Sequence, residues 1–265
     1  MYKAVFLDLD GTLLDDNKKI SEENKEAIKQ AKEKGVQIFL CSGRQQNLVK
    51  DYKNEINASD YIICCNGAEI YDCNSKQELF SANLPEDIVY NLYDYANSRN
   101  YLTRIDTRYG RFINNMKYFI SKEVEIESDV NKFISENKVL QFTIGTETEE
   151  EIDSVIEYVK SLNRSDIKIE NKYLAKAKTY TVWAINIINV NTSKGNAING
   201  LCKFLKINLD NVIGMGDDHN DISMMKTVGY GVAMGNAVPI LKEYAKEVTL
   251  TNNESGVAKI LKTKI

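Results

Sequence analysis

The chain has 265 residues, 43% of them hydrophobic and 27% charged, and its 34 basic and 38 acidic side chains give a net charge of −4. This composition excludes a mainly disordered chain, and the acidic balance argues against sequence-independent binding to nucleic acid. No stretch approaches the roughly 18 consecutive apolar residues that a membrane span needs. Five cysteines without metal-ligand spacing and an N-terminus without a signal-peptide pattern predict a cytoplasmic protein with reduced thiols.

The N-terminal part alternates between short apolar runs and helical patterns. Strands are predicted for residues 3–9, 36–41 and 61–65. A helix is predicted from Ser21, as its N-cap, to Lys34, with Gly35 as its stop, and another helix follows Arg44. The runs are apolar throughout, which is typical of parallel strands that are buried on both faces.

The C-terminal part repeats this alternation. Helices are predicted for residues 194–205, after the acidic loop that begins at 216, and from near Pro239. Strands are predicted for residues 211–215, 230–234 and 247–250. Strands that alternate with helices indicate an α/β fold with a doubly wound, Rossmann-like parallel sheet.

The middle of the chain has a different pattern, richer in tyrosine and in alternating sequences. Helices are predicted from Pro85, at position N1, and for residues 149–161. Strands are predicted for residues 108–114, 140–145 and 180–189. We therefore expect an α+β domain at residues 84–183, inserted into a discontinuous core domain of residues 1–83 and 184–265.

The first polar motif is Asp8-Leu9-Asp10, directly after a predicted strand. Two carboxylates two residues apart in extended backbone project to one side, and such close like charges are costly without a cation between them. A divalent metal would resolve this repulsion, and Mg²⁺ prefers oxygen ligands. A solvated acidic turn is the alternative, but Asp8 follows Val5-Phe6-Leu7 and should be drawn partly out of water.

The second motif lies after a C-terminal strand and combines a glycine turn with an acidic cluster. Asp217, Asp218, Asn220 and Asp221 fall within five residues. Acidic groups near a helix N-terminus also complement the helix dipole, which accounts for one of these residues and not for all of them. Because ligands bind at the carboxyl ends of strands in such sheets, we expect this cluster to pair with Asp8.

Two further candidates lie at predicted helix starts. Ser42 and Gly43 offer a hydroxyl and backbone N–H groups that suit an anion, although Ser-Gly turns are common without any ligand. Lys194 stands in a first helical turn, where the dipole disfavours a cation. A solvated surface lysine is the alternative, but the many carboxylates predicted nearby favour a fixed cation at this position.

These four motifs follow one another along the chain as DLDGTLL at 8–14, SGR at 42–44, the SKG lysine at 194 and GDDHNDISM at 216–224. With this set the chain resembles the haloacid dehalogenase superfamily, and within it the Cof-type phosphatases with a type IIB α/β cap. Asn66-Gly67-Ala68, after the third predicted strand, is also similar to the family. The resemblance spans essentially the whole chain and implies a Rossmann-like core with an inserted cap that supplies substrate specificity.

The resemblance also implies a mechanism, that of a Mg²⁺-dependent phosphatase that forms an aspartyl-phosphate. Asp8 would be the nucleophile, and Asp10 the general acid and base. The metal would be bound by the Asp8 carboxylate, the Asp10 backbone carbonyl and Asp217, with Asp221 in support. The phosphoryl oxygens would be held by Ser42, the N–H groups of Leu9 and Gly43, Lys194 and Asn220.

The chain departs from the family pattern at two positions. Ser42 stands where threonine is commoner, and Asn186 stands where an acidic residue is frequent, which could alter contacts at the cap hinge. Four of the six arginines fall within thirteen positions of the predicted cap, namely Arg99, Arg104, Arg108 and Arg111. We hypothesise that some of them contact a second anionic group of the substrate. The alternative is a solvated strand edge with ion pairs inside the chain.

The expected substrate is a small-molecule phosphate ester, such as a sugar phosphate or a phosphorylated cofactor. No nucleic-acid or membrane partner is expected, and the chain should be a monomer or a weak homo-oligomer. The alternative activity is that of a phosphotransferase or phosphomutase acting on sugar phosphates at the same site, with a cap that admits a second substrate in place of water. A phosphorylated signalling domain would be much shorter and would lack the inserted domain.

Overall fold

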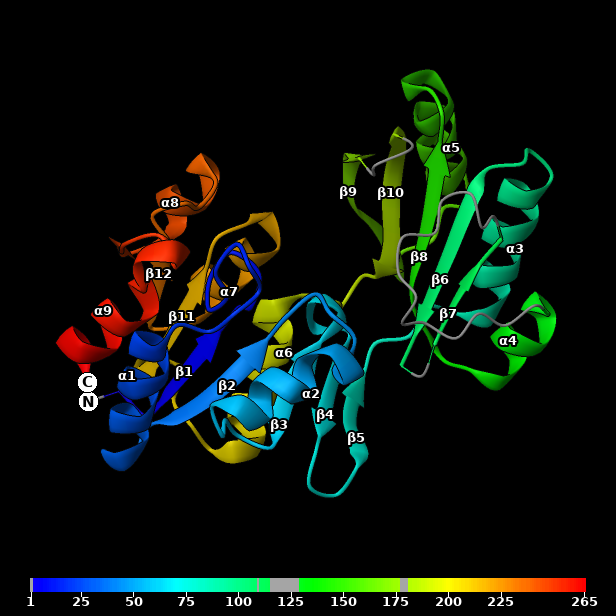
Figure 1. Cartoon of the computed structure of the whole chain (residues 1–265). Coiled ribbons are helices and arrows are strands. Elements are labelled where there is room, and N and C mark those ends of the chain that lie inside the picture. Colours follow the sequence, from blue (N-terminus) through cyan, green and yellow to red (C-terminus); the bar gives the residue numbers. More distant parts are fainter. Residues whose placement is uncertain (1, 109, 115–128, 177–180) are drawn as a thin grey trace. The chain divides into compact units, whose positions relative to one another are not determined.

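A computed structural model describes residues 2–108, 110–114, 129–176 and 181–265. The chain forms two compact units, the first of Met1–Ser81 with Thr192–Ile265 and the second of Ala82–Asn191 (Figure 1). The second unit is longer than the insertion that the sequence predicts at 84–183. It extends further because strand β10 (Thr181–Asn189) runs unbroken past residue 183 and belongs to the sheet of this unit.

The first unit contains a mixed eight-stranded sheet in the order β13-β12-β11-β1-β2-β3-β4-β5. Its strands are β1 (Ala4–Leu7), β2 (Gln37–Cys41), β3 (Tyr61–Cys64), β4 (Glu69–Asp72), β5 (Gln77–Ser81), β11 (Val212–Gly216), β12 (Tyr230–Ala233) and β13 (Glu247–Val248). The six strands from β13 to β3 are parallel, whereas β4 and β5 join as antiparallel strands. The parallel, doubly wound α/β core expected from the sequence is thereby confirmed.

Helices cover both faces of this sheet (Figure 1). They are α1 (Glu22–Glu33), α2 (Gln46–Glu55), α6 (Lys194–Leu205), α7 (Ile222–Thr227), α8 (Pro239–Tyr244) and α9 (Gly256–Lys264). Ile62 pairs with Tyr71, so Tyr71 points away from the face of Tyr61. Lys50 of α2 lies over the Tyr71 ring and Phe204 of α6 contacts Tyr61, which places α2 and α6 on opposite faces.

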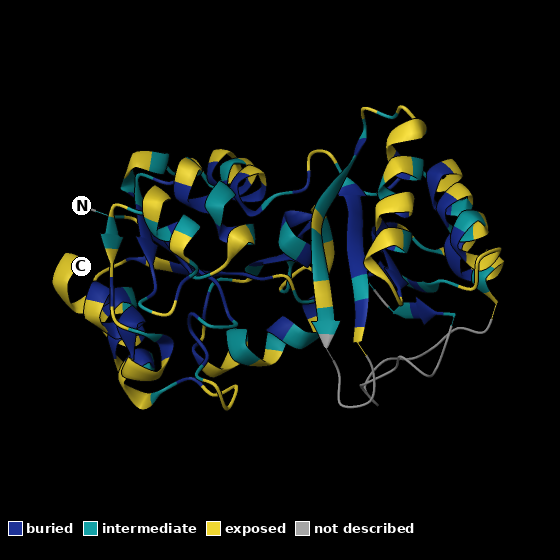
Figure 2. Cartoon of the chain, turned by 90° about the horizontal axis from the view of Figure 1, so that it is seen from above, coloured by how far each residue is buried: buried dark blue, intermediate teal, exposed yellow. Residues whose placement is uncertain are grey.

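The centre of the first unit is a hydrophobic core, because its middle strands are apolar on both faces. All four residues of β1 are fully buried, and Phe6 stacks on Phe39 of β2 with ring centroids 4.6 Å apart. Figure 2 shows the buried strands between helices that are exposed only on their outer sides. Hydrophobic burial of this kind fixes the register of β1, and so the place where the polar residues after it emerge.

The second unit contains an antiparallel five-stranded sheet in the order β7-β6-β8-β10-β9. Besides β10, its elements are α3 (Glu86–Asn97), β6 (Leu102–Thr107), β7 (Arg111–Ile113), α4 (Val130–Glu136), β8 (Val139–Thr146), α5 (Glu149–Ser161) and β9 (Ile167–Lys176). One sheet face is apolar, with Ile105, Phe142 and Ile185 in a core cluster that includes α3 and α5 residues. The other face is polar and includes Thr143 and Asn186.

Several elements differ from the sequence expectations. Pro85 is the N-cap of α3 and not position N1, because its ψ of 138° is extended and the helix begins at Glu86. The strand expected at 108–114 is shorter, since β7 covers only 111–113. Residue 180 of the strand expected at 180–189 lies outside the described residues. The predicted bounds of the helices at 149–161 and 194–205 agree with those of α5 and α6.

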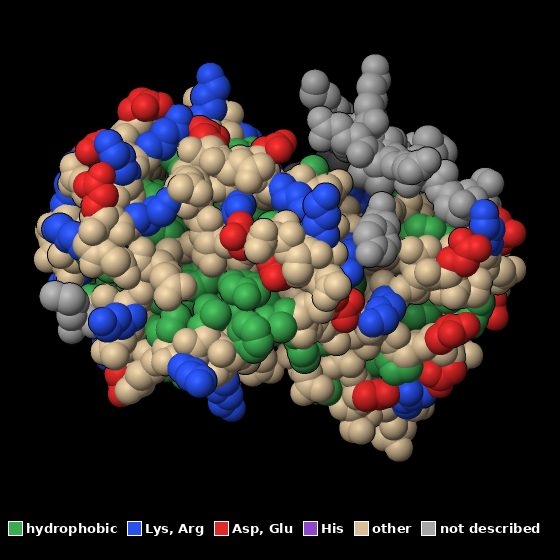
Figure 3. Space-filling model, turned by 90° about the horizontal axis from the view of Figure 1, so that it is seen from below, with side chains coloured by type: hydrophobic (Ala, Val, Ile, Leu, Met, Phe, Trp, Pro, Cys, Tyr) green, Lys and Arg blue, Asp and Glu red, His purple; other side chains and the backbone are tan. Residues whose placement is uncertain are grey.

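The surface carries both signs of charge, interspersed over the face shown in Figure 3. Among the large apolar side chains that are exposed, Phe204 has the highest exposed fraction, at 53%. Within the described part of the chain, no helix has the length and hydrophobicity that crossing a membrane requires. All five cysteines are free, and four of them are buried.

Candidate active site

Two neighbouring strands of the first unit bring their following residues to one edge of the sheet. Asp8 follows β1, Asp217 follows β11, and the two strands pair in parallel with Leu7 opposite Met215. The Asp8 N–H extends this pairing by donating to the Met215 carbonyl at 3.0 Å. Both acidic residues therefore lie at the carboxyl ends of adjacent strands, as the sequence motifs predict.

A buried lysine joins this edge. Lys194 begins α6 and its side chain is fully buried. Its Nζ donates to Asp8 Oδ1 and to Asp221 Oδ1, each at 2.6 Å. A cation at a helix N-terminus is unfavourable against the dipole, and a buried unpaired one would be far more costly. The two carboxylates offset both effects, so the solvated surface lysine is wrong for this position.

The loop after β11 is organised around Asp221. Asp221 Oδ2 accepts the backbone N–H groups of Asp217 and Asp218, at 2.9 and 3.1 Å. Asp217 Oδ1 accepts the Thr12 hydroxyl at 2.9 Å, which ties this loop to the turn after β1. Gly11, at φ +77°, lies against the same carboxylate, because a Cβ there would be 2.2 Å from Asp217 Oδ2.

Burial perturbs the ionisation of these carboxyls. Burial raises the pKa of Asp8, the nearby Asp221 and Asp217 raise it further, and Lys194 opposes them. The pKa of Asp217 is raised to about 6, again mainly by burial. Burial disfavours the Lys194 ammonium, but Asp221 and Asp8 outweigh that effect and hold its pKa above the usual value. The cluster therefore has a marked affinity for positive charge.

Asp10 does not project beside Asp8, contrary to the expectation from extended backbone. β1 ends at Leu7 and the chain then turns, with the Leu13 N–H donating to the Asp8 carbonyl at 3.3 Å. The Asp10 carboxylate instead accepts Arg44 Nε at 2.7 Å and Nη2 at 2.6 Å, and Lys18 Nζ at 2.7 Å. Partial burial opposes ionisation of Asp10, but these hydrogen bonds outweigh it and lower its pKa to about 2.

The remaining predicted residues also surround this edge. Ser42 is buried directly after β2, and its hydroxyl accepts the Arg44 N–H at 3.2 Å. Asn220 Nδ2 donates to Asn66 Oδ1 at 2.9 Å, and that same oxygen lies 2.7 Å from where a Cβ at Gly43 would be. The sequence singled out Asn66 without giving it a role, because its partner lies 154 positions away.

The site includes a group of carboxylates that suits a metal ion. Asp8, Asp217 and Asp221 each offer an oxygen, and these atoms lie within 4.8 Å of one another. An all-oxygen donor set fits a hard divalent cation. Both Asp221 oxygens already accept hydrogen bonds, so this residue suits support of the other two better than direct coordination.

Other singled-out residues make contacts outside this cluster. Leu9 is buried in the turn, where its carbonyl accepts the Leu14 N–H at 2.9 Å. In the second unit, Arg104 and Arg111 both donate to Asp106, so two of the four clustered arginines form ion pairs inside the chain. Arg99 instead lies over the Tyr95 ring, 3.9 Å from its centroid.

Asn186 lies inside β10, which continues to Asn189. Its Oδ1 accepts hydrogen bonds from Thr143 at 2.8 Å and from Tyr173 at 3.2 Å. The residue is thus part of the polar sheet face of the second unit, and the expectation that an asparagine here alters contacts at the cap hinge stays a prediction.

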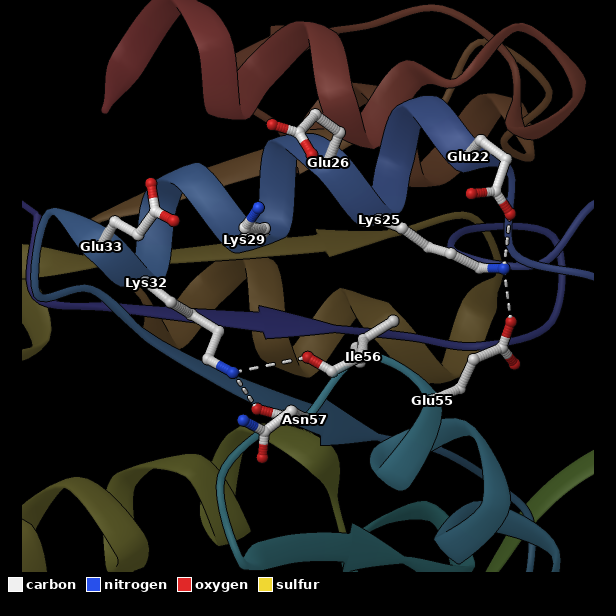
Figure 4. A pocket seen from close by; sticks show the side chains of 9 residues that line it. All are labelled: Glu22, Lys25, Glu26, Lys29, Lys32, Glu33, Glu55, Ile56 and Asn57. Carbon is white, nitrogen blue, oxygen red and sulfur yellow. Dashed lines mark hydrogen bonds and ion pairs between the residues drawn. The ribbon is translucent and has the colours of Figure 1, made fainter.

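A cavity of about 710 Å³ lies elsewhere in the first unit, along α1 and the end of α2 (Figure 4). Its lining is charged, and two of its lysines already have partners. Lys25 contacts Glu22 at 2.7 Å and Glu55 at 2.8 Å, and Lys32 donates to the Ile56 carbonyl at 3.5 Å. None of the residues of the predicted site lines this cavity.

Comparison with known proteins gives the same family throughout the chain. The model of the haloacid dehalogenase-like hydrolases matches residues 5–261. The chain is 31% identical over 260 residues to the 5-amino-6-(5-phospho-D-ribitylamino)uracil phosphatase YcsE of Bacillus subtilis, which covers 98% of this chain and 94% of that protein.

Solved structures agree with this result. A haloacid dehalogenase-like hydrolase from Bacteroides thetaiotaomicron superposes with a TM-score of 0.81 at 26% identity, with full coverage of both chains. A subclass IIB sugar phosphatase of the superfamily has the same fold, with a TM-score of 0.76 at 24% identity and 98% coverage of each chain. The resemblance expected from the motifs is thereby confirmed, and the chain belongs to the haloacid dehalogenase-like hydrolase family.

Proposed function

We propose that the chain is a Mg²⁺-dependent phosphatase of small phosphomonoesters that works through an aspartyl-phosphate on Asp8. The observation that carries this proposal is the fully buried Lys194, whose Nζ lies 2.6 Å from both Asp8 and Asp221. A carboxylate held at a strand end beside a fixed cation suits attack on a phosphoryl group, whose charge the cation helps to neutralise. The 31% identical YcsE, named as a phosphatase, supports the same activity.

In the first step an Asp8 oxygen bonds to phosphorus while the bond from phosphorus to the leaving oxygen breaks. Lys194 favours the ionised form of Asp8, although burial still raises the pKa of that carboxyl to about 8, and Asp221 holds Lys194 from the other side. Asp10, as the general acid, donates a proton to the leaving oxygen. In the second step Asp10 takes a proton from water, which attacks phosphorus and releases Asp8 as a carboxylate together with free phosphate.

The contacts of Asp10 favour its second role over its first. Arg44 and Lys18 stabilise the carboxylate and lower its pKa to about 2. A carboxylate can accept a proton from water, whereas a general acid must first be protonated. Donation to the leaving group therefore requires that Asp10 part from Arg44, whereas the hydrolytic step can proceed from the observed pairing.

The phosphoryl oxygens are held, in this proposal, by donors that lie around Asp8. These donors are the Ser42 hydroxyl, the N–H groups of Leu9 and Gly43, Lys194 and the Asn220 amide. Fixed donors directed at developing charge are the main source of catalysis in phosphoryl transfer. Ser42 and Lys194 are buried, so their positions are set before substrate binds.

Mg²⁺ fits the donor set of this site. We propose that the Asp8 carboxylate, the Asp10 backbone carbonyl and Asp217 hold it, with Asp221 orienting the loop of Asp217. When bound, the ion would offset the repulsion between the Asp8 carboxylate and the phosphoryl oxygens. Gly11 contributes by leaving room for the Asp217 carboxylate.

The second unit is proposed as the cap that selects the substrate, which makes this cap longer than the insertion expected at residues 84–183. Its polar sheet face offers hydroxyl and amide groups, among them Thr143, Tyr173 and Asn186, which suit hydroxyl-bearing ligands. Arg104 and Arg111 share one carboxylate, Asp106, so the three together keep one positive charge for an anionic group. Sugar phosphates and phosphorylated cofactors are therefore the classes to test.

The deciding experiment measures phosphate release from a panel of phosphomonoesters that includes sugar phosphates and 5-amino-6-(5-phospho-D-ribitylamino)uracil. Wild type, Asp8→Asn and the exposed control Asp51→Asn are compared with Mg²⁺ and with EDTA. We expect Mg²⁺-dependent release by wild type and Asp51→Asn, and none by a folded Asp8→Asn, because an amide is a poor nucleophile. Release by Asp8→Asn or in EDTA would contradict the mechanism. Transfer to a second sugar phosphate in place of water would identify a phosphotransferase.

A further inference from the structure

The turn Cys65–Gly67 has an uncommon backbone conformation. All three residues have positive φ, at 50° for Cys65, 57° for Asn66 and 92° for Gly67. L-residues other than glycine disfavour this region, asparagine less than most. Such conformations persist where the surroundings over-determine them, and they are frequent at functional sites.

The surroundings of this turn are three separate loops that supply proposed phosphate-binding groups. The Cys65 and Asn66 N–H groups donate to the carbonyls of Arg44 and Ser42, at 3.0 and 3.1 Å. Gly67 lies against the start of α6, because a Cβ there would be 2.2 Å from the Ser193 carbonyl oxygen. The third loop, after β11, is contacted by the Asn66 side chain.

That side chain contacts two proposed phosphate-binding residues with one atom. Asn66 Oδ1 accepts Asn220 Nδ2 at 2.9 Å and lies directly over Gly43, where a Cβ would come within 2.7 Å of it. Among the described residues, this is the only hydrogen bond of the Asn220 side chain, whose Oδ1 is buried without a donor. An amide rotates easily about its last torsion, so this one bond selects its orientation.

We propose that Asn66 is a positioning residue that holds the Asn220 amide and the Gly43 backbone in register for the phosphoryl group, an inference that rests on the proposed function of the site. One Asn220 Nδ2 hydrogen is held by Asn66, which leaves the other for a phosphoryl oxygen. A neutral acceptor is required at position 66, because a carboxylate there would repel the anion.

The test compares Asn66→Gly with Asn57→Gly. Glycine tolerates the left-handed backbone, so Asn66→Gly removes the side chain without new strain. Asn57 has φ 47° and an exposed side chain, which makes it a matched control. We expect kcat/KM for phosphate release to fall about 10- to 100-fold in Asn66→Gly. This is the value of the hydrogen bond from Asn220 to the charged phosphoryl group, which is lost when the amide is no longer held. Asn57→Gly should remain near wild type.

A double-mutant cycle separates positioning from a merely structural role. In an Asn220→Ala background, removal of the Asn66 side chain should lower kcat/KM by no more than about threefold, because its main effect acts through Asn220. Equal losses in both backgrounds would overturn the inference. Asn66→Asp keeps the acceptor and should restore the Asn220 contact, yet bind inorganic phosphate more weakly than wild type.

Absence of phosphate release by wild type would refute the proposed function. A second measurement tests the inference about Asn66 even in that case. The chain is labelled with ¹⁵N-asparagine, and the solvent exchange of the Asn220 side-chain amide is followed by NMR. We expect faster exchange in Asn66→Gly and unchanged exchange in Asn57→Gly. Unchanged exchange in Asn66→Gly would show that Asn66 does not hold the amide.

Discussion

The buried charged side chains at the proposed site of the first unit include more carboxylates than cations. One ammonium, Lys194, is shared by Asp8 and Asp221, and Asp217 adds a third carboxylate nearby. Desolvation makes buried ion pairs weak contributors to stability. The proposed catalytic role therefore explains the cluster better than a stabilising one does, since apolar packing would stabilise the same volume better.

Gly11 and Gly35 allow a matched test of this cluster. Both have left-handed backbone, at φ 77° and 83°, but a Cβ at Gly35 meets nothing within 4 Å. Alanine at either position should cost about 1–2 kcal/mol of stability. Only Gly11→Ala pushes on Asp217, so its phosphatase activity should fall about 100-fold. Equal activities of the two variants, measured by phosphate release, would contradict the proposed role of Asp217.

The sequence predicts which residues meet at this site better than it predicts where their side chains point. Asp8 and Asp217 were placed together because both follow apolar strands, and that rule depends only on the fold class. The separation of Asp10 from Asp8 was missed, since it depends on Arg44 and Lys18 reaching the same carboxylate. Such contacts need three-dimensional coordinates, because no local pattern encodes them.

Between elements, α1 and α9 are joined by a buried asparagine. The Asn24 Oδ1 accepts the Ala258 N–H in the first turn of α9 at 2.9 Å. The N-cap of α9, Ser255, makes no capping bond with its own side chain. Asn24 thus satisfies from another helix a donor that α9 would otherwise leave unpaired.

Asn24→Ala should therefore lower the free energy of unfolding by about 1–3 kcal/mol, as a lost cap with a buried unsatisfied donor. Lys29→Ala, an exposed change on the same helix, should have little effect. Urea unfolding of the two variants measures the difference. If both lose the same small amount, the contact with Ala258 contributes nothing to the docking of α9.

The last strand and the last helix are joined by Glu247. Its carboxylate accepts the Tyr230 hydroxyl at 2.6 Å and Lys264 Nζ at 2.9 Å, and these bonds lower the pKa of Glu247. A carboxyl with a lowered pKa in the folded state stabilises the protein above its unfolded pKa. That contribution is lost as pH falls through the unfolded value and towards the folded one.

Glu247→Gln should therefore be less stable than wild type by about 1 kcal/mol at pH 7. The difference should shrink as the pH is lowered below about 4.5, where the unfolded carboxyl takes up its proton. Urea titrations of both proteins at pH 7, 5 and 4 measure this convergence. A stability difference that is the same at every pH would mean that the charge of Glu247 does not contribute to stability.

At the level of elements, prediction succeeded where a helix is amphipathic and carries its own caps. The predicted range 149–161 agrees with α5, whose N-cap Thr148 forms a capping box with Glu151. No such signal identified β4, β5 or β9. β5 and β9 are edge strands with polar residues, and β4 is a strand of only four residues that includes Glu69 and Asp72, so their strand character depends on the partners beside them.

At the scale of the whole molecule, the two ends of the second unit lie next to each other. Asn189 Nδ2 donates to the Asn83 carbonyl at 2.9 Å, and the Leu84 N–H donates to the Val139 carbonyl at 2.8 Å. The unit also has its own hydrophobic cluster, centred on Phe142 and the apolar faces of α3 and α5. Both features are typical of an insertion that folds by itself.

Residues 82–191 expressed alone should therefore fold. We expect circular dichroism to show a cooperative thermal transition, together with the helix and strand content of the second unit. As a control, the same segment with Phe142→Asp should show no such transition, because a charge is then forced into the core. Absence of a transition in the unaltered segment would show that the second unit depends on the first.

The strand order of the first unit has a consequence for synthesis of the chain. β1 lies at the centre of its sheet, but its neighbour β11 is encoded far away, with Ala4 opposite Val212. At ribosomal speeds, roughly 10–40 s separate the emergence of the two strands. During that interval one edge of an apolar strand stays unpaired, an aggregation risk in a nascent chain. The inserted unit, continuous in the message, can complete its own sheet first, so the pairing of β1 with β11 that brings Asp8 and Asp217 together follows the folding of that unit.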